Sequence, residues 1–316
     1  MRIFLGKKLM ITTAAFNTII YHFLRFFNLK SAAMRKQLFI GLLLTISLVA
    51  CKKKDKPVEI AAQNISNVSY GADARNVMDV FLPANRSETS TPVLIMIHGG
   101  GWSSGDKADF APFVDTMKRR FPNYAVFNIT YRLAGNNMNL FPAQEQDVKK
   151  CIEFIYSKRG EYKISDKFVL AGASAGGHLA LLHAYKYTVP VKIKAVVDFF
   201  GPTELTAFYN NPPTFLVPIL LLNVTGTTPT LNPTLYQQSS PYTFATAASA
   251  PTIILQGGAD IVVSPSQSTL LRDRLTTLGV ANQFVFYPSG GHGDWDAATY
   301  NDGFNKIEAF IKTHNP

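Results

Sequence analysis

A serine enclosed by glycines is the first residue in the sequence whose setting could support chemistry. The segment GASAG, Gly172 to Gly176, matches the pattern G-x-S-x-G, and it lies between the apolar run KFVLA and the helical pattern GGHLALLHAY. A sharp turn from strand to helix leaves no room for large residues beside the serine and directs its hydroxyl away from the sheet. The pattern therefore predicts that Ser174 is a nucleophile rather than an ordinary helix-capping serine.

A serine hydroxyl needs a base, and the position of each histidine decides which one can serve. The sequence has six histidines: His22, His98, His178, His183, His292 and His314. His178 and His183 follow Ser174 on the same expected helix, where their side chains point along the helix rather than at the hydroxyl. His292 lies in the loop PSGGHGDW after the last expected strand. Loops at the carboxyl ends of parallel strands converge on one site, so we expect His292 to be the base.

The base in turn needs an acid that fixes its tautomer and stabilises the imidazolium. Asp260 ends the segment TIILQGGAD, which is the expected strand before that of His292. Asp294 and Asp296 are alternatives, but they lie too near His292 in the chain to be placed easily on its Nδ1 atom. Asp198, on the preceding expected strand, is a further alternative. We expect Asp260 to be the acid.

Three consecutive glycines in HGGGWSSGDK, His98 to Lys107, follow the apolar run VLIMI. Glycine costs more conformational entropy on folding than any other residue, so a triplet needs a reason. Attack on an ester carbonyl creates an oxyanion, which backbone N–H groups stabilise by about 3–4 kcal/mol each. We expect these donors to be the N–H groups of Gly100, Gly101 and Ala175, and His98 to brace the loop by hydrogen bonds.

Strands and helices alternate along the rest of the chain. Strands are expected at 64–71, 76–83, 93–97, 124–131, 167–174, 193–202, 251–260 and 282–288, and helices at 109–121, 143–162, 175–185, 264–279 and 303–314. Such alternation predicts an α/β fold with a mostly parallel eight-stranded sheet and helices on both faces.

Residues 203–250 interrupt this pattern. The segment is rich in Pro, Thr and Asn and holds one apolar stretch, FLVPILLL. A connection of this length between two core strands is usually functional. Two interpretations stay open: a lid over the site, or a packed surface excursion. Aromatic residues that could line a pocket, or equally pack in the core or lie on the surface, are Trp102, Phe200, Tyr209, Phe215 and Trp295.

Charge and cysteine content exclude several kinds of partner. The net charge of +10 is concentrated in residues 1–56, whereas residues 57–316 hold twenty basic and twenty acidic side chains. We therefore expect no nucleic-acid partner. The two cysteines, Cys51 and Cys151, form neither a disulfide framework nor a metal site. Cys151 lies in a helical pattern and is predicted to be a buried free thiol. No metal or cofactor is implied.

The N-terminal region has the pattern of an export signal. The string MRKQLFIGLLLTISLVAC begins at Met34 with two positive charges and continues into an apolar run that is short for a membrane span. Its end, LVAC, resembles the lipobox of bacterial lipoproteins, which implies a lipidated Cys51. Residues 1–50 are then a leader, in which translation starts at Met34 and 34–50 form the signal peptide. Residues 51–63 are a lipidated tether, and 64–316 form the catalytic domain. An ordinary signal peptide or an N-terminal anchor helix is the alternative.

Several motifs together resemble a known family. The segments DVFLP, HGGGWSSGDK, YRLA, FPAQEQDVKKCIEFI and AGASAGGHLA are similar to those of esterases with the α/β-hydrolase fold that are related to hormone-sensitive lipase. The branch that contains bifunctional feruloyl and acetyl-xylan esterases is the most similar. Ala173 stands where hormone-sensitive lipases usually carry Asp, which also favours that branch. By this resemblance Ser174, Asp260 and His292 match the triad, and Gly100, Gly101 and Ala175 match the oxyanion hole.

The sequence thus predicts a serine carboxylesterase that acts on short acyl or feruloyl esters, including those on plant polysaccharides. Its partners would be a small ester or an esterified oligosaccharide, and a membrane through the lipid on Cys51 in the bacterial cell envelope, facing the periplasm or the cell surface. Two alternatives stay open. One is an amide or peptide hydrolase of the same fold, similar to arylformamidases or dipeptidyl peptidases. The other is a non-catalytic, glycan-binding surface lipoprotein.

Overall fold

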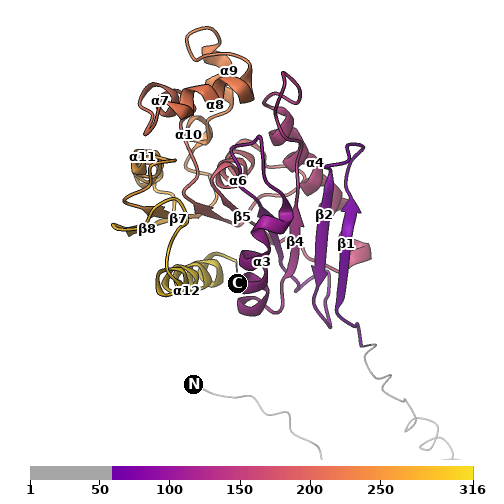
Figure 1. The fold of residues 1–316 in the computed structure, drawn as a ribbon. Coiled ribbons are helices and arrows are strands. Elements are labelled where there is room, and N and C mark those ends of the chain that lie inside the picture. The colour runs from indigo at the N-terminus through magenta and orange to yellow at the C-terminus, as the bar shows by residue number, and fades with distance from the viewer. Residues whose placement is uncertain (1–58, 316) are drawn as a thin grey trace, which may run out of the picture. The chain divides into compact units, whose positions relative to one another are not determined.

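An eight-stranded sheet forms the centre of residues 59–315, the part of the chain that the computed structural model describes (Figure 1). The expectations for the leader, for the lipidation of Cys51 and for residues 51–58 of the tether lie outside the described residues. The strands are β1 (Gln63–Ser69), β2 (Val77–Leu82), β3 (Val93–Ile97), β4 (Ala125–Ile129), β5 (Phe168–Ala173), β6 (Ala195–Phe199), β7 (Thr252–Gly257) and β8 (Asn282–Tyr287).

The strand order is β1-β2-β4-β3-β5-β6-β7-β8. Strand β2 pairs antiparallel with both β1 and β4, and every other neighbouring pair is parallel. This confirms the prediction of a mostly parallel sheet. The parallel strands β3 to β8 all end at the same edge, so the loops that follow them can meet there.

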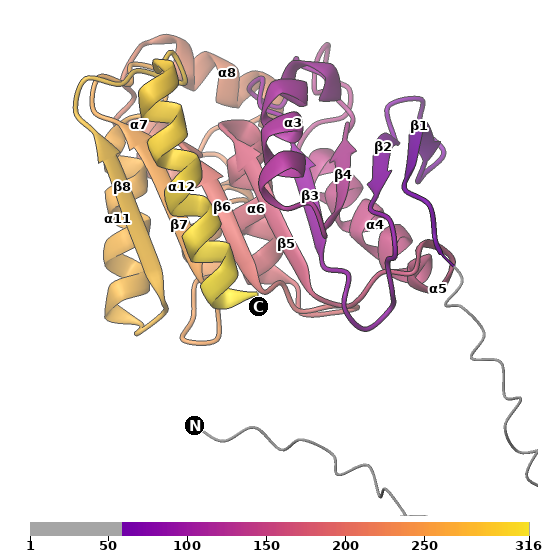
Figure 2. The ribbon, with the colours of Figure 1, turned by 90° about the horizontal axis from the view of Figure 1, so that it is seen from below.

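Helices cover both faces of this sheet (Figure 2). The longer ones are α3 (Ala111–Arg120), α4 (Ala143–Ser157), α6 (Ala175–Lys186), α11 (Pro265–Thr277) and α12 (Ala297–His314). Helices α3 and α12 pack on one face, and α4, α6 and α11 on the other. Alternate residues of the central strands enter opposite cores: Leu94 and Met96 face α3 and α12, whereas Ile95 faces α4 and α6. The continuous apolar run of β3 is therefore buried on both sides.

The segment 203–250 forms four short helices rather than an irregular loop. They are α7 (Leu205–Asn210), α8 (Leu216–Thr225), α9 (Pro233–Gln238) and α10 (Pro241–Phe244). Figure 1 shows α7, α8 and α9 together, above the end of the sheet at which the loops meet. Most of the apolar stretch of the sequence lies in α8, which begins after Phe215 and is followed by Gly226 at a left-handed φ of 70°.

Most of the other elements lie close to their expected positions, with two differences. The last helix, α12, begins at Ala297 rather than at residue 303. The expected helix 143–162 breaks at Lys158, which separates α4 from the short α5 (Arg159–Tyr162). Ser264 caps α11 through a hydrogen bond from the N–H of Ser266, and Pro265 is its first residue. Cys151 is a buried free thiol, which confirms that prediction. Residues 59–315 contain no helix with the length and apolarity needed to cross a membrane.

Candidate active site

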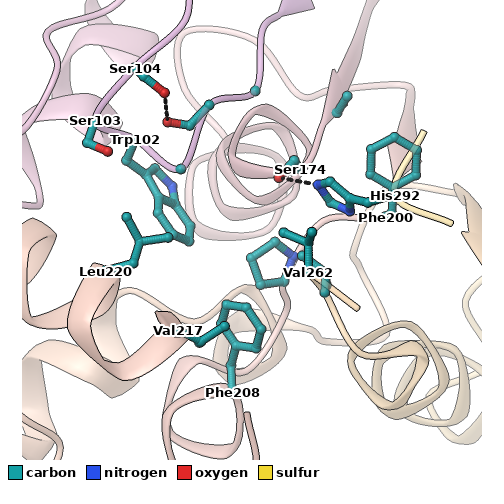
Figure 3. A pocket seen from close by; sticks show the side chains of 16 residues that line it. Trp102, Ser103, Ser104, Ser174, Phe200, Phe208, Val217, Leu220, Val262 and His292 are labelled. Carbon is teal, nitrogen blue, oxygen red and sulfur yellow. Dashed lines mark hydrogen bonds between the residues drawn. The ribbon is translucent and has the colours of Figure 1, made fainter. Parts of the chain in front are cut away.

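Ser174 lies at the sharp turn between β5 and α6. Its backbone has φ 55° and ψ −122°, a conformation that costs a non-glycine residue roughly 1–3 kcal/mol. Neighbouring elements hold it in place, because its N–H donates to the carbonyl of Phe199 at 2.8 Å and its own carbonyl accepts from the N–H of His178 at 3.0 Å. The serine side chain lines a pocket at the end of the sheet (Figure 3).

Two glycines beside the serine are required by close approach of backbone. A Cβ atom on Gly172 would lie 2.3 Å from the carbonyl carbon of Gly176, and one on Gly176 would lie 2.1 Å from the carbonyl oxygen of Ile97. Helix α6 therefore begins in direct contact with strands β5 and β3. The motif G-x-S-x-G follows from this contact, since no side chain fits at either end.

His292 contacts both Ser174 and Asp260. Its Nε2 atom lies 3.0 Å from Ser174 Oγ, and its Nδ1 atom lies 2.8 Å from Asp260 Oδ2 (Figure 3 shows the serine contact). An ionised carboxylate can only accept, so Nδ1 carries the proton and Nε2 is free to accept the hydrogen of the serine hydroxyl. The three side chains come from loops after β5, β7 and β8. An arrangement with these distances can move a proton from serine to imidazole.

Asp260 is held as a carboxylate by several donors. Its Oδ1 accepts from the N–H groups of Val262 and Val263 at 2.8 and 2.9 Å, and its Oδ2 accepts from Gln256 Nε2 at 3.1 Å. Burial raises the pKa of Asp260, but the hydrogen bond and charge of His292 and the two backbone donors outweigh it, so the net pKa lies below the usual value. Asp260 therefore stays ionised and can act as the hydrogen-bond partner of His292.

The three alternative acids have other contacts. Asp198 is fully buried, and its Oδ1 accepts from the N–H of Gly201 at 2.9 Å. Its Oδ2 has no partner within the described residues, and burial raises its pKa well above the usual value. Asp296 caps α12 by accepting from the N–H of Thr299 at 2.7 Å. Asp294 is exposed. His292 thus has Asp260 as its carboxylate partner.

The glycine loop forms the opposite wall of the same pocket. Gly100 and Gly101 line it beside Ser174, with φ values of 104° and 57° that only glycine adopts easily. Within the described residues, neither N–H group has a recorded acceptor. Ala175, the first residue of α6, has no acceptor within the helix for its N–H. The loop and the helix start can therefore offer free donors next to the serine.

His98 lies behind this loop rather than in the pocket. Its ring stacks on Tyr131 at 4.4 Å between centroids, and its Nδ1 lies 2.7 Å from the carbonyl oxygen of Gly99. The Tyr131 hydroxyl donates to the carbonyl oxygens of His98 and Gly99 at 3.0 and 3.2 Å. Stacking and hydrogen bonds therefore brace the loop through both residues.

The pocket has a volume of about 510 Å³ and an apolar lining. Its large side chains are Trp102, Phe200, Phe208, Val217, Leu220 and Val262. Among the expected aromatics, Trp102 and Phe200 line this pocket, but Tyr209 and Phe215 do not. Phe215 is 77% exposed, and Trp295 is buried against Phe200. Phe208, the neighbour of Tyr209 on α7, lines the pocket where Tyr209 was expected to do so.

Several residues of the site were not identified from sequence. Gln256 supports Asp260, Leu220 lies within 3.2 Å of a Cβ placed on Gly101, and His178 accepts a hydrogen bond from the indole of Trp102. The sequence signals were present but weak. Gln256 is a polar residue in an otherwise apolar strand, and His178 is one of two histidines in an apolar helix.

Strand order, the serine turn and the loops after β7 and β8 together define the α/β-hydrolase fold. The chain belongs to the BD-FAE family, whose model matches residues 78–275. A curated relative is LipM of Mycobacterium tuberculosis, named a probable carboxylic ester hydrolase. It is 28% identical over 235 residues, which are 70% of this chain and 53% of LipM. The chain spans between half and three fifths of the length of LipM and of the related esterase LipC.

Two solved structures share the fold. A protein described as bifunctional GH43-CE from Bacteroides eggerthii aligns with a TM-score of 0.67 and 26% identity, over 78% of this chain and 38% of that one. A truncated carbohydrate esterase from gut microbiota aligns with a TM-score of 0.68 and 23% identity, over 80% of this chain and 96% of that one.

Proposed function

We propose that this protein is a serine carboxylesterase with Ser174 as nucleophile, His292 as general base and Asp260 as the acid that orients it. The observation that carries the proposal is the continuous contact of the three side chains, 3.0 Å from serine to histidine and 2.8 Å from histidine to aspartate. The named activity of the relative LipM supports ester hydrolysis.

The reaction proceeds in two halves. Nε2 of His292 takes the proton of Ser174 as Oγ attacks the ester carbonyl, and the imidazolium then protonates the leaving alcohol. The acyl group stays on Ser174 until water, deprotonated by the same imidazole, releases it as the free acid. Asp260 keeps the proton on Nδ1 throughout and stabilises the imidazolium by its charge.

The glycine loop stabilises the oxyanion of each half-reaction. The N–H groups of Gly100, Gly101 and Ala175 are the donors that we assign. Each such donor contributes roughly 3–4 kcal/mol to the transition state, because it is already oriented when charge develops. A side chain at Gly101 would also meet Leu220 and narrow the pocket.

The substrates that we propose are short acyl or feruloyl esters, including those carried by plant polysaccharides. The pocket supports an uncharged substrate, since His292 is its one titratable side chain among the described residues. Its aromatic and aliphatic walls suit an apolar acyl or aryl group. The description of the Bacteroides eggerthii protein as a GH43-CE supports a carbohydrate ester.

Residues 203–250 serve as a lid in this proposal. Helices α7 and α8 contribute Phe208, Val217 and Leu220 to the pocket wall, and this supports the lid interpretation over that of a surface excursion. The lipobox pattern at Cys51 supports a further part of the proposal, attachment to the bacterial envelope through a lipid. Incorporation of a labelled fatty acid into the wild type, and its loss in Cys51→Ser, tests that part.

A substrate panel tests the proposal. Purified protein is assayed with nitrophenyl acetate and butyrate, a feruloylated sugar, acetylated xylan and a matched aryl amide. We expect turnover of esters and a loss of several orders of magnitude in Ser174→Ala, whose folding is checked by circular dichroism. Turnover of the amide in preference to its ester would favour the peptidase alternative. Ester turnover in Ser174→Ala above about 10% of wild type would refute Ser174 as nucleophile.

A further inference from the structure

His178 connects three parts of the site. It lies on α6, and its N–H donates to the carbonyl of Ser174 one helical turn earlier. Its Nδ1 accepts from the indole Nε1 of Trp102 at 3.1 Å, and its Nε2 lies 2.7 Å from the carbonyl oxygen of Ser239. Trp102 directly follows the glycine triplet, and Ser239 follows α9 in the segment 203–250. One side chain therefore bridges the loop and the lid from the helix that carries the serine turn.

The partners of His178 fix its tautomer. An indole N–H can only donate and a carbonyl oxygen can only accept, so Nδ1 is unprotonated and Nε2 carries the hydrogen. The ring is fully buried, and burial lowers the pKa of His178 to about 4, so it is neutral in the ordinary pH range. The imidazole thus acts as a fixed hydrogen-bonding link and not as a base.

Trp102 needs such a link because its backbone is strained. It has a φ of 59°, directly after two glycines that also have positive φ. A bulky residue keeps that conformation only where its surroundings impose it. The carbonyl of Trp102 accepts from the N–H of Ala134 at 3.0 Å, and the buried indole is anchored at His178. Losing the indole anchor would leave a buried N–H unpaired and release the loop on one side.

We propose that His178 is a positioning residue, which holds Trp102 so that the N–H groups of Gly100 and Gly101 stay aimed at the oxyanion. The proposal rests on the proposed esterase function. Because the oxyanion exists only in the transition state and the intermediates, a displaced loop lowers kcat and leaves KM nearly unchanged. Displacement of a catalytic group by about 1 Å costs up to about 100-fold in rate.

Two substitutions separate the contacts of His178. His178→Asn keeps an acceptor near the position of Nδ1, whereas His178→Phe keeps the ring volume and removes both hydrogen bonds. Trp102→Phe removes the donor while His178 stays in place. The matched control is His183→Phe on the same helix, because His183 is also buried and neither of its ring nitrogens has a partner within the described residues.

The experiment measures kcat and KM for an ester in each variant, with kcat expressed per serine that a fluorophosphonate can label. Labelling and turnover by the wild type establish the esterase function separately, so a failure there is distinct from a failure of this proposal. We expect kcat to fall at least fivefold in His178→Phe and in Trp102→Phe, with KM within about twofold in His178→Phe, whose altered side chain does not line the pocket. His178→Asn should recover part of the loss, and His183→Phe should match the wild type.

Smaller effects would overturn the proposal. If kcat per labelled serine in His178→Phe stays within fivefold of the wild type, or if the loss appears in KM alone, His178 does not position the loop. A fall of the same size in His183→Phe would show a general effect of replacing buried histidines in α6. Should His178→Phe not fold, Trp102→Phe decides the question by the kcat threshold alone, because Trp102 also lines the pocket.

Discussion

His292 Nε2 lies 3.0 Å from Ser174 Oγ, although the two residues are 118 positions apart in the chain. The parallel sheet accounts for this contact. Ser174 follows β5 and His292 follows β8, and both strands end at the same edge. Strand β7 lies beside β8 and delivers Asp260 to the other nitrogen of the imidazole.

Asp260→Asn tests the role of the carboxylate. The amide can donate to Nδ1, which would favour the tautomer with the hydrogen on Nε2 and leave no acceptor for the serine hydroxyl. We expect kcat to fall by about 10⁴-fold with a small change in KM. Steady-state kinetics with a nitrophenyl ester measure both. The control is Asp294→Asn, an exposed acid two residues from His292, which should retain wild-type rates. Equal losses in the two variants would contradict the assignment.

The pH dependence of kcat/KM tests which group limits activity in acid. His292 accepts a proton only while its Nε2 is free, so protonation abolishes activity. The pKa of Asp260 lies below its usual value, so this carboxylate stays ionised in weakly acidic solution. We expect an acid limb with a slope of one, since a single proton is taken up. A slope of two, or the absence of an acid limb, would contradict this account.

Asp198→Asn tests the buried acid of β6 through the pH dependence of stability. Burial raises the pKa of Asp198, so the folded state keeps a proton that the unfolded chain releases above about pH 4. The free energy of unfolding therefore falls as pH rises, by up to about 1.4 kcal/mol per pH unit. The Asn variant lacks this contribution. Urea unfolding at about pH 5 and pH 8 measures this difference. Relative to the wild type, the free energy of unfolding of the variant should be higher at about pH 8 than at about pH 5; identical pH dependences would refute the interpretation.

Gly176→Ala tests the close contact beneath the serine turn. A Cβ atom there would lie 2.1 Å from the carbonyl oxygen of Ile97, so α6 or β3 must move. We expect the free energy of unfolding to fall by about 1–3 kcal/mol or more, together with a loss of esterase activity. Gly135→Ala is the control, because a Cβ at Gly135 meets nothing within 4 Å. Wild-type stability in Gly176→Ala would contradict the described contact.

The sequence predicts the sheet and the choice of Ser174, Asp260 and His292 because apolar runs and the order of the loops can both be read from it. Continuous apolar runs such as β3 indicate buried strands, and chain order after successive strands indicates which loops meet. Asp260 could be distinguished from Asp198 only by weighing strand positions, whereas the structure distinguishes them by contact with His292.

The sequence does not predict contacts between side chains that lie far apart in the chain. Nothing in the pattern around His178 indicates an acceptor for Trp102, because that contact depends on how α6 and the glycine loop pack. The lid is similar. An apolar stretch at α8 predicts a helix, but not that Val217 and Leu220 face the pocket while Phe215 lies in solvent. Such details depend on tertiary packing.

The most direct test of the catalytic assignment is site-mapped labelling with a fluorophosphonate. The protein is treated with the probe, esterase activity is followed with time, and the adduct is located by mass spectrometry of peptides. This account predicts a single adduct on Ser174 that forms in step with the loss of activity and does not form in Ser174→Ala. An inactivating adduct on another residue, or full activity with Ser174 completely labelled, would contradict it.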